Sequence, residues 1–434
     1  MPLNSKGSEG AVTYSPSRAE KYVTVILGTM MVMVTLGFVS STRSLFPDEI
    51  ARELGVSRSA VVVGESLRYI STSIVNVFFG ALIAKFGEKK MITLGFASLI
   101  ASVLLYATAE TLVGIYVGGI LLGIGFSQTT TAMVGYIVGK RFTENKGTVM
   151  GAMLASNGIG GAVAIQIVGG LIDPAVVGSY RRAYFVIAVV LAVAMLIVLI
   201  FYRGTPDKAA PIVAKNAPID STPSSEWQGI PFCEAKRQFS FYGALVCIFF
   251  SGMILQGTHG IVAMHFKDVG LDYDKIKWLL SAGSFILAGT KLATGICYDR
   301  FGLRVTASAC TAISVISSLI LAFTTGNEWG LILAGIYTVI SPFALPLETV
   351  MLPIYANELF GKHSYSKILG IFVSVNTAGY AVGAPVMNLC YDVLGSYKYA
   401  LIVISVIMSA VFVLLQAVIS ASAKARTSME GAKG

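Results

Sequence analysis

Five charged residues lie inside long apolar stretches of this sequence: Arg43, Glu65, Arg68, Lys291 and Glu348. An unpaired charge at the centre of a bilayer costs about 2.5–3.5 kcal/mol on insertion scales, so such residues commonly face a polar cavity and mark a pathway. Three of the five are basic. A buried cation without a permanent counter-ion is stabilised when an anion binds, and the pattern therefore predicts a site for a small anion.

Lys291, in the stretch "ILAGTKLATGI", is the residue hardest to explain without a ligand. Its distance along the helix from Asp299 corresponds to about 12 Å, too deep for its amine to reach the surface easily. Leu287 and Gly295 flank it one turn away, so its own helix offers no acid. We expect Lys291 to bind a substrate carboxylate, and an interhelical ion pair with Glu348 is the alternative.

The other charged residues allow more than one interpretation. Arg43 and Arg68 are expected in the outer half of the membrane, where they would attract anions from outside. Arg68 can instead pair with Glu65, because residues spaced i and i+3 share a helix face, and Arg43 can extend its guanidinium toward the surface. Glu348 is the candidate proton carrier. It lies near mid-depth of a segment interrupted by Pro342, Pro346 and Pro353.

Uncharged polar residues give weaker candidates. Asn157, Asn376 and Tyr380 are expected to contact substrate, with interhelical hydrogen bonds as the alternative for the two asparagines. Packing is the alternative for the tyrosines Tyr337, Tyr355 and Tyr380. His259 is expected to be an ordinary interfacial histidine near the outer end of its segment.

The elements that position these residues must be membrane helices. Of 434 residues, 55% are hydrophobic and 13% are charged, whereas soluble domains carry about a quarter charged residues. Apolar runs of about twenty residues recur, each long enough to cross the hydrocarbon. The sequence predicts an all-α polytopic protein with twelve transmembrane helices. The expected spans are 22–46, 58–84, 90–109, 111–139, 147–172, 181–202, 239–266, 276–299, 304–325, 329–359, 364–391 and 397–421.

These spans divide into two sets of six. The first residues are polar and lack the apolar core of a signal peptide. Roughly two thirds of the 32 Lys and Arg residues fall on the side of both termini, which the positive-inside rule assigns to the cytoplasm. We expect a multi-pass protein of the plasma membrane whose basic charge reflects topology and not nucleic-acid binding. The expected parts are a tail 1–21, a half 22–202, a linker 203–238, a half 239–421 and a tail 422–434.

The two halves repeat a short loop and a helix segment. "GALIAKFGEKK" after the second span aligns with "GICYDRFGLR" after the eighth, and "GAMLASNGIG" aligns with "GIFVSVNTAG". Repeats of this kind place a substrate site at their interface near the midplane and favour rocking of one half against the other. The residues expected in the gating loops are Gly80, Gly87, Lys89, Gly295, Asp299, Arg300, Gly302 and Arg304.

The second loop resembles the G-x-x-x-D-R-F-G-x-R signature of the major facilitator superfamily. "GFVSSTRSLFPDEI", "KRFTENKGTVMGAMLASNGIGG", "LPLETV" and "YDVLGSYKYAL" resemble the monocarboxylate-porter and oxalate/formate-antiporter branches. The resemblance covers nearly the whole chain outside the tails and the linker. It implies two pseudo-symmetric six-helix halves and transport by alternating access.

The resemblance also implies roles for single residues. Lys291 falls where those porters have an arginine that holds the substrate carboxylate, and Arg43 matches a lysine proposed to couple protons to substrate. Leu287 replaces the acid that pairs with that arginine, which makes Glu348 the better acid candidate. Ala84 replaces the aspartate of the first signature loop, so Asp299 is the acid expected to form the latch of the outward-facing state.

The function expected from the sequence is a secondary active transporter, acting as a monomer, that moves a small organic anion with a proton. A monocarboxylate is favoured, because Asn376, Thr377 and Tyr380 stand where oxalate-type antiporters carry a further lysine. An anion/anion exchanger without proton coupling and a transporter-like receptor are the alternatives. No catalytic residues, metal or cofactor are expected, since hydrolase, zinc and ATP-binding motifs are absent from the sequence.

Overall fold

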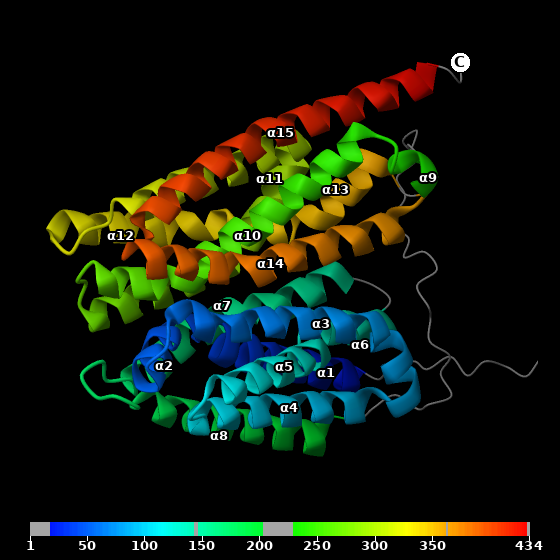
Figure 1. The fold of residues 1–434 in the computed structure, drawn as a ribbon. Coiled ribbons are helices and arrows are strands. Elements are labelled where there is room, and N and C mark those ends of the chain that lie inside the picture. Colours follow the sequence, from blue (N-terminus) through cyan, green and yellow to red (C-terminus); the bar gives the residue numbers. More distant parts are fainter. Residues whose placement is uncertain (1–17, 143–145, 203–228, 362, 432–434) are drawn as a thin grey trace, which may run out of the picture.

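The computed structural model describes residues 18–142, 146–202, 229–361 and 363–431, and these residues form helices joined by short turns. Figure 1 shows their arrangement. In the first part of the chain, the helices are α1 (Arg18–Val32), α2 (Pro47–Leu54), α3 (Arg58–Phe86), α4 (Glu88–Thr108), α5 (Leu112–Thr129), α6 (Thr131–Arg141), α7 (Lys146–Gly170) and α8 (Tyr180–Phe201). In the second part they are α9 (Phe232–Ala235), α10 (Phe239–Asp268), α11 (Tyr273–Ala322), α12 (Glu328–Ile340), α13 (Met351–Phe360), α14 (Tyr365–Leu394) and α15 (Tyr397–Gly431).

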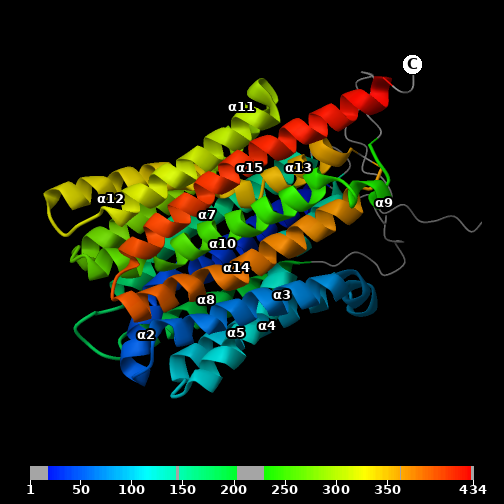
Figure 2. The same ribbon diagram turned by 45° about the horizontal axis from the view of Figure 1, so that its top comes forward.

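Two groups of helices lie side by side along a common direction. Helices α1–α8 form one group, here the N-bundle, and α10–α15 form the other, here the C-bundle (Figures 1 and 2). The described chain begins with α1 and ends with α15 at the same end of the molecule, here the terminal end. The opposite end, which carries α2, is the distal end. A site between the bundles is therefore built from both parts of the sequence.

The expected spans correspond to the long helices. Within the described residues, eleven helical stretches are long and apolar enough to cross a membrane. The 50-residue α11 contains a non-helical residue, Gly302, with φ 75°, and two arms on either side of it cover the expected spans 276–299 and 304–325. At about 1.5 Å per residue, α11 is far longer than one crossing requires. Helix α15 continues beyond the expected boundary at 421, and most of the expected tail 1–21 and linker 203–238 lies outside the described residues.

Two of the spans are broken near their middle, and each break carries a charged residue. After α1 the chain continues as a π-helix (Met33–Ser40), turns, and forms a 3₁₀ turn (Arg43–Leu45) that begins with Arg43. Pro342 and Pro346 interrupt the tenth span, since proline has no N–H to donate, and Glu348 ends the 3₁₀ turn Leu345–Glu348. Irregular backbone at membrane depth is tolerated where it is buried in protein or lines a cavity.

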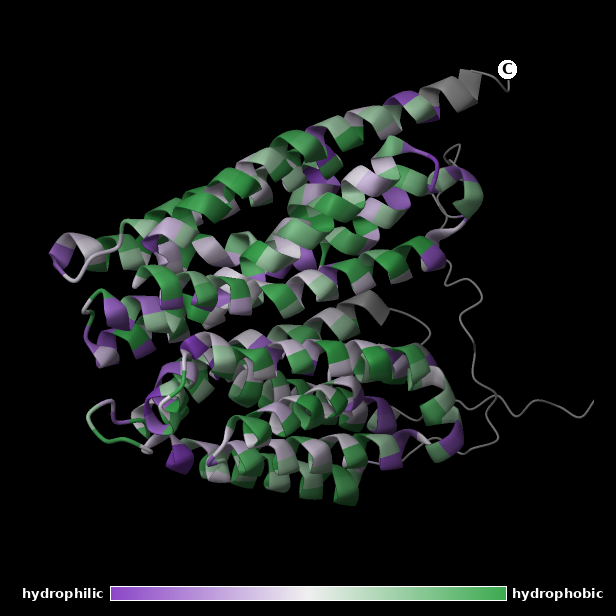
Figure 3. Ribbon diagram, viewed as in Figure 1, coloured by the Kyte–Doolittle hydropathy of each residue, from purple (hydrophilic) through white to green (hydrophobic). Residues whose placement is uncertain are grey.

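Small residues bring the helices into close contact. A Cβ added at Gly123 on α5 would collide with the main chain of α3 at Arg68, and one added at Gly158 on α7 would lie 2.6 Å from the Ser284 carbonyl oxygen on α11. The Gly158 contact joins the two bundles. Apolar residues cover most of the helix surfaces, and hydrophilic residues gather toward both ends (Figure 3). The helix sides have the character of surfaces that face lipid.

Candidate functional site

Arg43 lies between the two bundles and contacts side chains from both. Its Nη1 donates to the Tyr69 hydroxyl at 2.6 Å, and its Nη2 donates to the Gln256 amide oxygen. The Glu65 carboxylate is 3.8 Å away, and His259 Nδ1 is 3.5 Å from Nη2. The Arg43 side chain is 12% exposed. The guanidinium therefore points into the protein and not toward the membrane surface, which corrects the alternative of a surface-reaching arginine.

Gln256 on α10 links Arg43 to Glu348. Its Oε1 accepts from Arg43 and from the Tyr69 hydroxyl at 3.0 Å, and its Nε2 donates to Glu348 Oε2 at 2.6 Å. A carboxamide has one accepting and one donating end, so the cation and the carboxylate fix its orientation. Tyr380 on α14 donates to the Glu348 carbonyl oxygen at 3.3 Å. Five side chains from both bundles thus form one hydrogen-bonded group, here the central network.

Glu348 is buried but incompletely satisfied. Its exposure is 4%, and its Oε1 has no hydrogen-bond partner among the described residues. Leaving a buried charged oxygen without a donor costs free energy. The unpartnered oxygen is therefore a position where a proton or a ligand donor is stabilised.

Lys291 on α11 is partly buried, and within the described part of the chain no ion pair or hydrogen bond to it occurs. Glu348 is the acid whose charge acts on it through space. The alternative of a direct interhelical pair between Lys291 and Glu348 is not formed in this conformation, since their charged atoms are not within 4.0 Å.

Glu65 and Arg68 neutralise each other, as their spacing allowed. Arg68 Nε donates to Glu65 Oε2 at 2.9 Å, and Nη2 is 2.7 Å from the same oxygen. The guanidinium lies over the Tyr69 ring at 4.0 Å and is 5.2 Å from the centre of the Phe126 ring. Arg68 is 6% exposed. Arg68 therefore packs against the ring of Tyr69. Attraction of anions from outside by Arg68 stays a prediction.

The two asparagines differ in position. Asn376 is 2% exposed and donates to the Ile248 carbonyl at 3.3 Å, which is the interhelical contact that was the alternative. Asn157 accepts from Ser41 at 3.4 Å on the side of α7 near the broken first span. Substrate contact by either residue stays a prediction. His259 lies beside Arg43 in the interior, so the expectation of an interfacial histidine is wrong.

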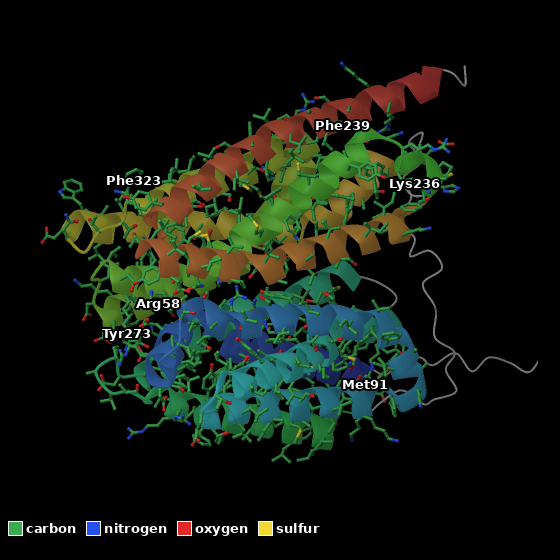
Figure 4. The ribbon with its side chains drawn as sticks, viewed as in Figure 1. Arg58, Met91, Lys236, Phe239, Tyr273 and Phe323 are labelled. Carbon is green, nitrogen blue, oxygen red and sulfur yellow. The ribbon has the colours of Figure 1, made fainter. Side chains whose placement is uncertain are left out.

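A second charged cluster joins the bundles at the distal end, here the distal ion-pair cluster. Arg58 at the start of α3 binds Asp268 at the end of α10 through two hydrogen bonds of 2.6 and 2.8 Å. Lys267 contacts Asp48 and also Glu49, the latter at 2.7 Å. Figure 4 shows Arg58 where the two bundles meet at this end. These pairs hold the distal ends of the bundles together.

Comparison with known proteins identifies the family. The sequence profile of the Major Facilitator Superfamily matches residues 25–264 and 244–433. The chain belongs to the Major Facilitator Superfamily. It is a membrane transporter of this superfamily, with the all-helical fold that the sequence predicted.

Individual proteins that resemble this chain have low sequence identity to it. The protein named "Uncharacterized MFS-type transporter YcxA", from Bacillus subtilis (strain 168), is 25% identical over 285 residues, which cover 64% of this chain and 66% of that protein. The match therefore spans just under two thirds of the relative's length. A crystal structure of a mutant of the nucleoside transporter NupG is 10% identical, with a TM-score of 0.75 over 91% of this chain and 99% of that chain.

A second solved structure describes a conformation. A bacterial homolog of the human lysosomal transporter Spinster, solved in an inward-facing and unoccupied conformation, has a TM-score of 0.66 and 13% identity, over 95% of this chain and 98% of that chain. At these identities the similarity shows the fold of the Major Facilitator Superfamily and nothing about the substrate.

The two signature loops of this superfamily member lie at the terminal end. Gly87 and Gly302 both adopt positive φ, 78° and 75°, a region that residues with a Cβ rarely adopt. Asp299 is exposed, and Arg304 donates to Ser420 on α15 at 2.6 Å. In the first loop, Glu88 is 4% exposed and lies 3.0 Å from Lys140. The sequence analysis noted only that Ala84 replaces the aspartate of the first loop. It missed that Glu88 supplies a buried acid in the same loop.

Sequence reasoning also missed Gln256 and Tyr69, which complete the central network. Neither residue is charged, so neither stood out in an apolar stretch. The available signal was the polar run "LQGTHG" inside the seventh span, since a glutamine near mid-membrane needs hydrogen-bond partners. The distal cluster was missed because its members lie in the first or last turn of helices, where charges are common.

Proposed function

We propose that this transporter moves a small organic anion, above all a monocarboxylate, together with a proton. One observation carries the proposal: Lys291 lies at membrane depth without an ion pair among the described residues, near a Glu348 carboxylate that has one unpartnered oxygen. A bound carboxylate would give Lys291 its counter-charge. Lysine acts as a point charge where arginine binds a carboxylate with two parallel hydrogen bonds, so recognition of one oxygen suffices.

Charge balance supports a proton as the second transported species. A monoanion and a proton together carry no net charge, so their movement does not oppose the membrane potential. Glu348 fits the proton carrier, because its buried Oε1 accepts no hydrogen bond from a described residue, while Gln256 donates to its Oε2 at 2.6 Å. Protonation at Oε1 keeps Oε2 as the acceptor of that hydrogen bond, which becomes weaker.

The closed distal end supports alternating access. We assign the terminal end to the cytoplasm and the distal end to the outside, since the predicted topology places most Lys and Arg residues on the side of the termini. In this assignment the distal ion-pair cluster closes the outer side. Rocking of the N-bundle against the C-bundle would break the contacts of Arg58 and Lys267 and expose the site to the outside.

Replacing Lys291 with glutamine tests the proposal. Removing one partner of a desolvated charge pair costs about 2–5 kcal/mol, so Lys291→Gln should weaken binding of the transported carboxylate by about 30-fold or more. Lys291→Arg keeps the charge and should retain most of the affinity. The measurement is radiolabelled uptake into proteoliposomes with a panel of mono- and dicarboxylates, a nucleoside and a dipeptide. Competition by the nucleoside or dipeptide, or unchanged carboxylate affinity in Lys291→Gln, contradicts the proposal.

An anion/anion exchanger is the second candidate, favoured by the excess of cations over acids in the spans. Arg43, Arg68 and Lys291 outnumber Glu65 and Glu348, so a bound anion alone can balance the interior charge. Counterflow in proteoliposomes separates the two functions: exchange that proceeds at the same rate with and without a pH gradient, with no net gradient-driven uptake, supports the exchanger.

A further inference from the structure

A cavity between the two bundles lies beside the central network and is lined mainly by apolar side chains. Its wall includes Ile165 from the N-bundle and Val262, Leu280 and Phe266 from the C-bundle, and its polar lining consists of hydroxyl groups and His259. None of the described residues that line it is an acid, a lysine or an arginine. This cavity, here the apolar chamber, has a volume of about 50 Å³ and fits a small, uncharged aliphatic group.

The chamber begins one helical turn beyond the charged residues, toward the distal end. The level of the membrane that holds Arg43, Gln256, Lys291 and Glu348 is here called the charged layer. On three segments of the C-bundle, a residue of this layer has a residue of the chamber wall one turn nearer the distal end. These pairs are Gln256 and His259 on α10, Lys291 and Leu287 on α11, and Glu348 and Leu345 in the broken tenth span. The chamber and the charged layer are therefore adjacent levels of one site, with His259 Nδ1 only 3.5 Å from Arg43.

We propose that the apolar chamber binds the hydrophobic body of the transported carboxylate, while its carboxylate group lies in the layer of Arg43 and Lys291. The substrate class is then a monocarboxylate with a short branched aliphatic body, such as isobutyrate. Acetate is too small to fill the chamber, and an aromatic acid such as phenylacetate is too large, since a benzene ring needs a cavity of about 150 Å³. The inference rests on the proposed function. It adds the chemical class of the substrate's body, which the charged residues do not contact. Burial of the body removes apolar surface from water, which favours larger bodies until the chamber is full.

Both bundles supply the wall, so the occupant touches both. Ser41 and Ser44 belong to the broken first span, and Leu287 and Leu345 belong to the C-bundle. A body that fills the chamber contacts the two bundles only while they are close together. Filling the chamber therefore stabilises the conformation in which the distal end is closed, because a ligand favours the state in which it makes more contacts.

Equilibrium binding to the purified full chain in nanodiscs tests the inference. Labelled isobutyrate is the probe, and acetate, phenylacetate, benzoate and isobutanol are the competitors. We expect isobutyrate to bind at least about tenfold more tightly than acetate, since single methylenes in a hydrophobic pocket change affinity by 10- to 200-fold, and more tightly than the two aromatic acids, whose rings exceed the chamber. Isobutanol, which has the branched body without the carboxylate, should compete poorly.

Two substitutions on α11 change the chamber in opposite directions. A Cβ at Gly283 would lie 3.5 Å from the Thr338 side chain and 3.7 Å from the Thr338 carbonyl oxygen, which are ordinary contacts, so Gly283→Leu adds bulk to the wall. It should weaken isobutyrate binding about tenfold and change acetate binding little. Leu287→Ala enlarges the chamber and should raise the relative affinity for the larger competitors. Gly289→Leu is the matched control, because Gly289 is exposed, has open space beside it and does not line the chamber.

The outcomes separate this inference from the proposed function. If carboxylates bind and Lys291→Gln abolishes binding, but affinity does not depend on the size of the body or on Gly283→Leu and Leu287→Ala, the chamber assignment is wrong and the proposed function stands. If no carboxylate binds to the unmodified chain, both are wrong. A size preference over acetate that Gly283→Leu removes, with the Gly289→Leu control unchanged, supports the chamber.

Discussion

At the scale of single residues, the central network connects a cation of one bundle to an acid of the other. Gln256 accepts from Arg43 and donates to Glu348, so its amide transmits the charge state of Glu348 to the contact between the bundles. An ionised Glu348 holds Gln256 in place more firmly than a neutral one, because hydrogen bonds to charged groups are stronger. Protonation of Glu348 would therefore loosen the contact through Arg43.

Replacing Glu348 with glutamine removes the titrating group and keeps an acceptor for Gln256. We expect Glu348→Gln to reduce pH-gradient-driven accumulation of the transported carboxylate by about tenfold or more while counterflow continues. The measurement compares both assays in the same proteoliposomes. Glu358→Gln is the control, since Glu358 lies on α13 and accepts from Tyr298 at 2.6 Å outside the central network. Full gradient dependence in Glu348→Gln excludes Glu348 as the proton carrier.

At the scale of elements, the reversals between paired helices depend on a backbone conformation that a Cβ disfavours. Gly302 separates the two arms of α11, and Gly87 separates α3 from α4. The positions have the same role in the two halves of the chain, which agrees with the repeat in the sequence. The loops fix where each following helix begins and hence the depth of the residues that it carries.

Alanine at Gly302 should destabilise the protein. Gly302 has φ 75° and ψ 178°, a region that is essentially restricted to glycine. A residue with a Cβ held there costs about 1–3 kcal/mol, so Gly302→Ala should lower the thermal unfolding temperature in detergent. Gly295→Ala is the matched control in the same loop region: Gly295 lies within α11, where alanine is favoured over glycine by up to about 1 kcal/mol and has open space. Equal unfolding temperatures for the two variants would show that the reversal does not depend on Gly302.

At the scale of the whole molecule, the distal ion-pair cluster joins the two bundles at one end. Burial pushes the pKa of Asp48 upward, but the hydrogen bond from Lys267 and the charges of Arg58 and Lys267 hold it below its ordinary value of 3.8. Because this pKa is lowered in the closed state, the stabilisation of closure by Asp48 is fully present above about pH 4. It is lost only as the pH falls through the lowered pKa.

The contribution of Asp48 to distal closure should therefore be constant between about pH 5 and 8, and the closure should be sensitive to loss of Asp48. Spin labels at Val176→Cys and Trp329→Cys, both exposed positions near the distal end, report the distance between the bundles in a background without native cysteines. Asp48→Asn should increase the fraction of distal-open molecules about fivefold at neutral pH, corresponding to about 1 kcal/mol. The control Asp274→Asn removes an acid that pairs with Lys277 on its own helix. Equal distances in Asp48→Asn and in the unmodified protein at neutral pH would contradict the role of Asp48 in closure.

The sequence by itself determined the membrane class, the superfamily and the charged candidates, because hydropathy, helix length and loop motifs are local properties. The pair of Glu65 and Arg68 was likewise predictable, since a spacing of three residues places both on one helix face. Only the tertiary structure decided what Arg43, Gln256 and His259 contact, because their partners lie on helices far apart in the chain. The apolar chamber and the distal ion-pair cluster also depend on how two bundles pack, and no periodicity within one helix encodes that arrangement.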